Sequence, residues 1–156
     1  MNGLRADQAP WHERIGAYVL LLDMGDFSMI KGAITNGHSW TISKQQHNFL
    51  VLGDLLPKEL IVDPHNVDLL LTINGEVRQK DNTGNMLFKI DEQIRYLEET
   101  ANITLGEGDL LMTGTPENIA PVREGDRLFA SLSVNGVEIS TIVENVRRQT
   151  KPTHLE

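Results

Sequence analysis

The chain has 156 residues, with 14 lysines and arginines against 22 aspartates and glutamates, so its formal net charge is −8. Its apolar share of 40% and charged share of 23% are those of a folded globular chain. The acidic balance argues against a protein that binds nucleic acid by neutralising phosphates, the absence of cysteine excludes disulfides and thiolate chemistry, and no apolar run approaches a membrane span.

The first third of the chain predicts a lead-in, a buried strand and a short helix. Residues 1–16 are polar and aperiodic, so we expect a lead-in segment without regular structure and without a secretory signal peptide. Ala17–Leu22 is an apolar run that ends at Asp23, which is typical of a buried strand that stops at a polar turn. Phe27–Ala33 predicts one or two helical turns, and residues 40–56 have a mixed pattern that favours no single element.

Two Asn-Gly pairs predict β-hairpins with tight turns. The first joins Asp68–Ile73 to Glu76–Gln79, and the second joins the strands 127–134 and 137–143. In the second hairpin, alternation predicts that one face of the first strand collects four apolar side chains, Leu128, Ala130, Leu132 and Val134. On the return strand the alternating set is Val137, Ile139, Thr141 and Val143.

A helix is predicted between the hairpins. Ile90, Ile94 and Leu97 recur at helical spacing, and Asp91 is the expected capping residue. These elements together predict an α+β fold that is mostly β, and they argue against a doubly wound nucleotide-binding fold, in which helices and strands alternate regularly.

After the helix, the sequence predicts a short strand that opens into a loop. Leu110–Met112 is apolar and leads into Thr113–Pro116, where Gly114 permits close approach to a ligand. The threonine hydroxyls and backbone N–H groups of that loop suit a carboxylate or a developing oxyanion, although a plain proline-terminated loop is the simpler interpretation. Residues 147–156 are expected to form a flexible tail.

Two further side chains are candidates for chemistry. Asp23 lies where a buried strand ends and is a suitable oxygen ligand for a hard cation, the alternative being a turn or helix cap. Lys44 is a charge stabiliser or an ordinary surface lysine. No histidine pair has metal-ligand spacing, no Gly-x-Ser-x-Gly elbow is present, and Gly106-x-Gly108 lacks the third glycine of a nucleotide loop.

The order of these motifs resembles the fumarylacetoacetate hydrolase family, and within it the acylpyruvase branch, from about Gly16 to about Val143. The matching motifs include Leu22-Asp23-Met24, Trp40-Thr41 with Lys44, Pro57-Lys58-Glu59, Asp63-Pro64-His65, Asn74-Gly75-Glu76 with Arg78-Gln79, Met86, Gly108-Asp109, Thr113-Gly114-Thr115-Pro116 and Gly125-Asp126. The resemblance implies a mixed β-roll with short helices, of which residues 17–146 form a partial catalytic domain with its N-terminal part missing.

The resemblance also implies a metal-dependent hydrolase that holds Mg²⁺ or Mn²⁺ with three carboxylates. Such an enzyme cleaves a carbon–carbon bond of acylpyruvates or related 2-oxo and 1,3-dicarbonyl acids, with oxaloacetate decarboxylation as a related activity. By this resemblance Asp23 is a metal ligand, Lys44 neutralises enolate charge and Thr115 is catalytic, while Thr113, Gly114 and Gln79 bind the substrate. A homodimer or a larger assembly, in a mitochondrial or cytoplasmic location, is the further expectation.

Three departures from the family pattern leave a second interpretation open. The family's Glu-x-Glu metal ligands and its His-x-x-Glu water-activating pair have no counterpart in this sequence. Phe27 and Ile30 stand where the family has an arginine and a glutamine. The chain alone is therefore expected to bind metal weakly and to turn over little, and a non-catalytic member that serves as a structural or interaction subunit is the alternative.

Overall fold

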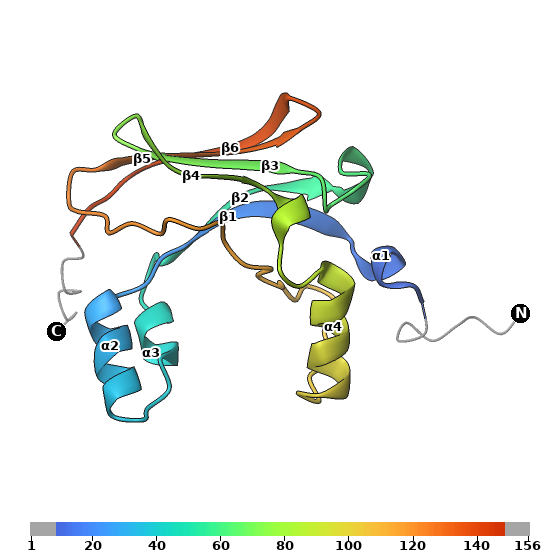
Figure 1. Cartoon of the computed structure of the whole chain (residues 1–156), viewed down its shortest axis with the longest axis horizontal. Coiled ribbons are helices and arrows are strands. Elements are labelled where there is room, and N and C mark those ends of the chain that lie inside the picture. The colour runs from blue at the N-terminus through green and yellow to red at the C-terminus, as the bar shows by residue number, and fades with distance from the viewer. Residues whose placement is uncertain (1–8, 149–156) are drawn as a thin grey trace, which may run out of the picture.

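The computed structural model describes residues 9–148, which form two antiparallel sheets and short helices (Figure 1). The strands pair in the orders β1-β2 and β4-β3-β5-β6. The predicted α+β, mostly β fold is confirmed. In chain order the elements are α1 (Trp11–Arg14), β1 (Ala17–Asp23), α2 (Phe27–Thr35), α3 (Thr41–Lys44), β2 (Leu50–Pro57), η2 (Lys58–Leu60), β3 (Asp68–Ile73), β4 (Glu76–Asn82), η3 (Thr83–Asn85), α4 (Ile90–Glu99), β5 (Arg127–Val134) and β6 (Val137–Asn145).

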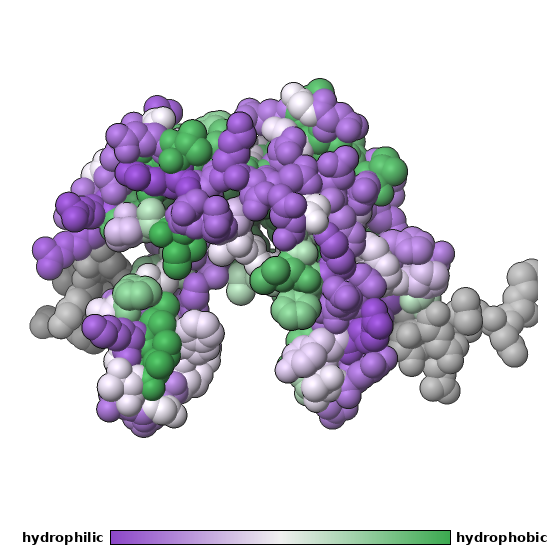
Figure 2. All heavy atoms as spheres, in the orientation of Figure 1, coloured by the Kyte–Doolittle hydropathy of each residue, from purple (hydrophilic) through white to green (hydrophobic). Residues whose placement is uncertain are grey.

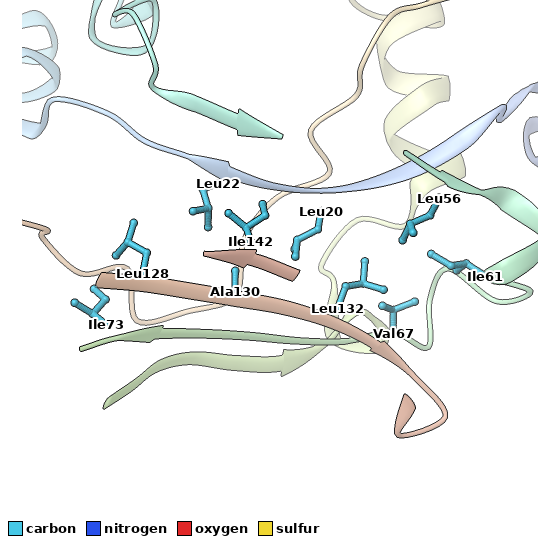
Figure 3. Close-up of a cluster of buried hydrophobic side chains, with 10 residues drawn as sticks. All are labelled: Leu20, Leu22, Leu56, Ile61, Val67, Ile73, Leu128, Ala130, Leu132 and Ile142. Carbon is cyan, nitrogen blue, oxygen red and sulfur yellow. The ribbon is translucent and has the colours of Figure 1, made fainter. Parts of the chain in front are cut away.

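The hydrophobic core lies between the two sheets. Leu20 and Leu22 of β1 point toward Ala130 and Leu132 of β5 and Ile142 of β6, and all five side chains are buried (Figure 3). A two-stranded ribbon is marginally stable by itself, so β1-β2 depends on burying this face against the larger sheet.

Both predicted hairpins are confirmed, and their turns have the backbone that the Asn-Gly pairs require. The φ angles are +54° at Asn74 and +84° at Gly75, and +52° at Asn135 and +76° at Gly136. Two consecutive residues with positive φ characterise the hairpin turn whose twist matches that of the flanking strands.

The alternation predicted along β6 is wrong beyond Ile139, which packs against the core. Ser140 and Ile142 are buried, whereas Val137 is 61% and Val143 is 48% exposed. The register changes where Leu132 pairs with Ser140 and the next residue of β5 pairs with Glu138, so one extra β6 residue lies in a β-bulge. Because strand side chains alternate with a period of two, one extra residue transfers the rest of the strand to the other face.

The predicted helix is confirmed as α4, but Asp91 does not cap it. Lys89 occupies the N-cap position, and its backbone N–H donates to the Glu92 carboxylate over 2.7 Å. Asp91 lies in the first turn and accepts from Arg95, one turn further along, at 3.2 Å. Glu92 at the third helical position thus satisfies the donor that precedes the helix.

Two other local predictions also differ from the structure. Leu110–Met112 forms no strand; no other part of residues 9–148 pairs with this segment, and an apolar run becomes a strand only when a neighbour completes its hydrogen bonds. A single helical turn, α1, lies within the expected lead-in. The predicted flexible tail falls mostly outside the described residues.

Helices α2, α3 and α4 project from one side of the sheets as two arms (Figure 1). In the view of Figure 1, α2 and α3 form one arm, α4 forms the other, and the segment from α4 to β5 passes beneath the strands. The space-filling view shows this face of the molecule hollowed between the arms (Figure 2). Within residues 9–148, no helix is both long and apolar enough to cross a membrane.

Candidate functional site

The structure brings two of the predicted site residues, Asp23 and Lys44, into an ion pair. Asp23 is the last residue of β1 and Lys44 is the last residue of α3. The Lys44 Nζ lies 2.7 Å from the Asp23 Oδ2, and the lysine and aspartate side chains are 36% and 41% exposed. A carboxylate and an ammonium at the partly open end of a sheet can present charge to a ligand, although such an exposed pair contributes little to stability.

The chain after β1 is shaped by backbone hydrogen bonds and by a helix cap. The Met24 N–H donates to the Phe49 carbonyl over 2.8 Å, and the Asp26 N–H donates to the Ser43 carbonyl over 3.2 Å. The Asp26 carboxylate accepts from the backbone N–H groups of Ser28 and Met29 at the start of α2. Asp26 is therefore the helix cap that was an alternative role for Asp23, so the Asp23 carboxylate is available to pair with Lys44.

The capping bonds also tune the acidity of Asp26. The Ser28 hydroxyl, followed by the Met29 backbone N–H, stabilises the ionised carboxylate and holds the pKa of Asp26 below its ordinary value. The sequence analysis missed this residue, although an aspartate directly before the apolar helix that starts at Phe27 is a recognisable capping signal.

A glycine leaves room for the Lys44 side chain. A Cβ built on Gly25 would lie 3.3 Å from the Lys44 Cε and 3.4 Å from both the Lys44 Nζ and the Ile30 Cδ1. These contacts place Lys44 and Ile30 against the same point of the backbone. Ile30, which stands where the resemblance implies a polar residue, therefore lies close to the same glycine as the lysine side chain.

The Thr113–Pro116 loop is held from two elements by glutamine side chains. Gln79 of β4 donates from Nε2 to the Thr115 Oγ1 over 3.0 Å and to the Pro116 carbonyl over 2.6 Å, with a longer contact of 3.3 Å to the Glu117 carbonyl. Gln93 of α4 donates to the Thr113 carbonyl over 3.0 Å. Gln79 is buried, and its amide nitrogen is engaged by the loop.

Between these two anchors the loop is open. Gly114 has a φ of +124°, which side-chain-bearing residues rarely adopt, and no atom lies within 4 Å of the Cβ position there. Thr113, Gly114 and Thr115 are all exposed. Their polar groups are therefore accessible to a small anionic ligand. The sequence analysis missed Gln93, because nothing in the helical pattern of α4 marks which polar residue meets a distant loop.

The predicted site residues thus form two groups. Asp23 and Lys44 meet at the root of the α2–α3 arm, and Gln79 meets Thr115 on the segment between α4 and β5. The structure gives no hydrogen bond or ion pair that joins the two groups within residues 9–148.

The donor set near Asp23 does not form a divalent-metal site within the described residues. No group of three His, Asp or Glu side chains gathers anywhere in residues 9–148, and the Asp23 carboxylate faces an ammonium. Mg²⁺ is reluctant to lose water and is normally held by more than one anionic ligand or by substrate phosphates. Asp23 can serve as one ligand, and the other residues described here do not complete the set.

Comparisons with known proteins relate the chain to one protein family and to named enzymes. Residues 3–153 match the protein family described as "Fumarylacetoacetate (FAA) hydrolase C-terminal". A mitochondrial oxaloacetate tautomerase of Schizosaccharomyces pombe is 43% identical over 122 residues, which cover 78% of this chain and 54% of that protein. A mitochondrial oxaloacetate tautomerase of Arabidopsis thaliana is 37% identical over 138 residues, which cover 88% of this chain and 59% of that protein.

Solved structures share the fold of this chain. The crystal structure of a fumarylpyruvate hydrolase from Pseudomonas aeruginosa, in complex with Mn²⁺ and pyruvate, matches with a TM-score of 0.74 and 28% identity. That match covers 88% of this chain and 57% of the other. The chain therefore spans a little more than half the length of these relatives.

Proposed function

Since the chain belongs to the fumarylacetoacetate hydrolase family, whose members include hydrolases, isomerases and tautomerases, we propose that it supplies part of an active site for the enolate chemistry of a 2-oxo acid. The favoured reaction is the keto–enol tautomerisation of oxaloacetate, in which C3 loses a proton and the 2-oxo oxygen gains one. The two similar tautomerases support this substrate.

The observation that carries the proposal is the Lys44–Asp23 pair, at 2.7 Å, at the partly open end of β1. As negative charge develops on the 2-oxo oxygen, the Lys44 ammonium stabilises it, and Asp23 holds the ammonium in place. The Thr115 hydroxyl and the backbone around Gly114 bind a carboxylate or carbonyl oxygen of the same molecule. No oxidant and no covalent intermediate are required.

The proposal assigns to this chain only one ligand of a divalent cation. The Mn²⁺ in the similar fumarylpyruvate hydrolase supports an oxygen-ligated cation, either Mn²⁺ or Mg²⁺, with Asp23 as one donor. Because the residues described here do not complete the donor set, we expect the chain by itself to bind either cation weakly.

We propose that a further polypeptide packs on the outer face of the β1-β2 ribbon and completes the cation site there. Cross-strand pairing places Val19 and Leu21 of β1 on the same face as Leu52 and Leu55 of β2, and this face continues to Asp23. Leu52 is 49% and Leu55 is 69% exposed. An apolar face of this kind is suited to a packing partner, such as a second subunit. The mitochondrial names of both tautomerases support a mitochondrial location for such an assembly.

Hydrolytic carbon–carbon cleavage of acylpyruvates is the second candidate. The similar fumarylpyruvate hydrolase favours it, because cleavage of such a substrate releases the same kind of enolate that Lys44 would stabilise. Tautomerisation is preferred because it needs only proton transfer, whereas cleavage also needs an activated water molecule.

The test is the enol-to-keto conversion of oxaloacetate by the full chain with Mg²⁺ or Mn²⁺, followed by the loss of the enol absorbance. We expect Lys44→Met to lower the catalysed rate by roughly 10²–10³-fold, as for the loss of one oxyanion donor, and Lys44→Arg to retain part of it. Lys80→Met is the matched control, because Lys80 is an exposed lysine of β4.

Two results would contradict the proposal. An undiminished rate for Lys44→Met would remove the role assigned to the lysine. No acceleration by the wild-type chain, assayed as a dimer and at cation concentrations high enough to load a weak site, would favour the non-catalytic alternative. Acetylpyruvate, assayed with the same variants, distinguishes cleavage from tautomerisation.

A further inference from the structure

We propose that Gln79 is a positioning residue that makes the Thr115 hydroxyl a hydrogen-bond donor toward the ligand. The inference rests on the proposed function, since the ligand is the carboxylate or carbonyl oxygen of a 2-oxo acid. It assigns Gln79 a role through Thr115 instead of direct substrate contact.

The acceptors around Gln79 determine which way its amide points. The Pro116 carbonyl, at 2.6 Å, and the Glu117 carbonyl, at 3.3 Å, can only accept hydrogen bonds. The nitrogen of the amide must therefore face the loop, with its oxygen turned away. The Thr115 Oγ1, 3.0 Å from the same nitrogen, consequently accepts an N–H from Gln79.

This orientation decides what the threonine hydroxyl can offer. A hydroxyl has one hydrogen and two lone pairs, and in Thr115 one lone pair is occupied by the Gln79 N–H. The Thr115 hydroxyl hydrogen cannot point at the Gln79 N–H, because both are donors, so it points away from Gln79. Because Thr115 is exposed and the neighbouring Gly114 is open, that hydrogen is available to a ligand oxygen.

A β-bulge turns Gln79 toward the loop. In the β3-β4 pair, Leu71 faces Gln79 and Thr72 faces Val77, so Arg78 is an extra residue between them. Leu71 packs against the core, and its cross-strand partner Gln79 lies on the same inner face. In a strand without the bulge, Arg78 would face inward and Gln79 outward.

Burial makes the loss of its hydrogen bonds to the loop unfavourable for the Gln79 amide. Gln79 is 8% exposed, and a buried polar group that loses its hydrogen bonds destabilises the folded state. The Gln93 contact to the Thr113 carbonyl anchors the other end of the loop. The two glutamines therefore bracket Gly114, and only Gln79 acts on the hydroxyl.

The first measurement needs no ligand. In NMR spectra of the full ¹⁵N,¹³C-labelled chain, the Gln79 side-chain N–H groups should exchange slowly with water and show a coupling across the hydrogen bond to the Pro116 carbonyl. Thr115→Val removes the hydroxyl acceptor from an exposed position and should shift one of these two N–H signals. Unshifted signals in Thr115→Val would overturn the inference.

The second measurement is a titration with pyruvate in the presence of Mg²⁺, followed at the Gly114 and Thr115 amides. We expect Gln79→Leu and Thr115→Val each to weaken binding about tenfold, as for the loss of one hydrogen bond to a charged group. The double variant should be no weaker than the single variants, because both remove the same donor. Lys80→Met, the next residue of β4, is the control.

The outcomes separate this inference from the proposed function. Pyruvate binding that is unchanged in Gln79→Leu would reduce Gln79 to a structural residue and overturn the inference. If pyruvate does not bind the wild-type chain, the proposed function fails for this chain, and the ligand-free N–H signals decide on the positioning role. If Gln79→Leu does not fold, the Gln79 side-chain N–H signals of the wild type and of Thr115→Val still support or overturn the inference.

Discussion

The two hairpins have the same local design and use it for different purposes. Each has an Asn-Gly turn and one extra residue in its second strand. In β5-β6 the bulge directs Ile142 into the core between the sheets, whereas in β3-β4 it directs a glutamine amide to the Thr113–Pro116 loop. A bulge therefore sets which face receives a side chain, and the neighbouring structure determines whether that face is core or site.

The largest expected effect separates the two faces of β6. Ile142→Ala removes buried carbon atoms from the core and should lower the free energy of unfolding by about 2–5 kcal/mol. Val143→Ala, at a side chain that is 48% exposed, should lower it by less than about 1 kcal/mol. Urea denaturation followed by circular dichroism measures both. Equal effects would show that the bulge does not set the inner face.

An intermediate effect is expected at the turns, because among residues 9–148 side-chain hydrogen bonds tie the first turn, and not the second, to another segment. The Asn74 side chain donates to the Asp126 carboxylate over 2.8 Å and accepts from the Arg127 N–H at 2.9 Å. Asn74→Ala should therefore lower the free energy of unfolding by about 2 kcal/mol, and Asn135→Ala by about 1 kcal/mol for the positive φ alone. Thermal unfolding of the two variants tests this order, which the reverse ranking would contradict.

The smallest expected effect is a pH dependence of the stability that the first hairpin turn contributes. The Asn74 side chain, followed by the Arg123 backbone N–H, holds the pKa of Asp126 below its ordinary value. A carboxyl with a lowered folded-state pKa contributes stability above its unfolded value, near 3.9, and this is lost as the pH falls through the lowered pKa. Acid should therefore weaken the turn below about pH 4.

Other carboxyl groups contribute to the same acid response, so a variant of Asp126 is needed as the control. The pKa values of Asp26, Asp81 and Glu98 are also lowered, chiefly by hydrogen bonds from Ser28, Asn85 and Arg14 respectively, so they share in the acid-induced loss of stability. Asp126→Asn should flatten the pH dependence in urea titrations between about pH 5 and pH 2 relative to wild type. An unchanged slope would contradict the assignment to Asp126.

The turns and the helix were predictable because their signals are local. An Asn-Gly pair needs only the backbone of two residues, and the apolar spacing of α4 needs only one helix face. Motif order likewise indicated the family, whereas a single site shared by Asp23, Lys44 and the Thr113–Pro116 loop stays a prediction. Leu110–Met112 failed as a strand because strand formation depends on a partner elsewhere in the chain.

The bulges and the site contacts were not predictable from the same signals. Nothing within β4 marks Arg78 as an extra residue, since the register depends on β3. Likewise, Glu92 and not Asp91 satisfies the backbone N–H that precedes α4, because of the side-chain geometry at Lys89. The contact of Gln93 is visible only where α4 meets the Thr113–Pro116 loop.

Local sequence was sufficient for the mostly β class, the two hairpin turns, the helix and the motifs that identify the family, because each depends on neighbours along the chain. The three-dimensional fold was needed to show that Asp23 pairs with Lys44, that Asp26 caps α2, and that Gln79 reaches Thr115. These contacts depend on distant segments, because side-chain direction in a sheet follows the pairing register, and packing between those segments sets that register.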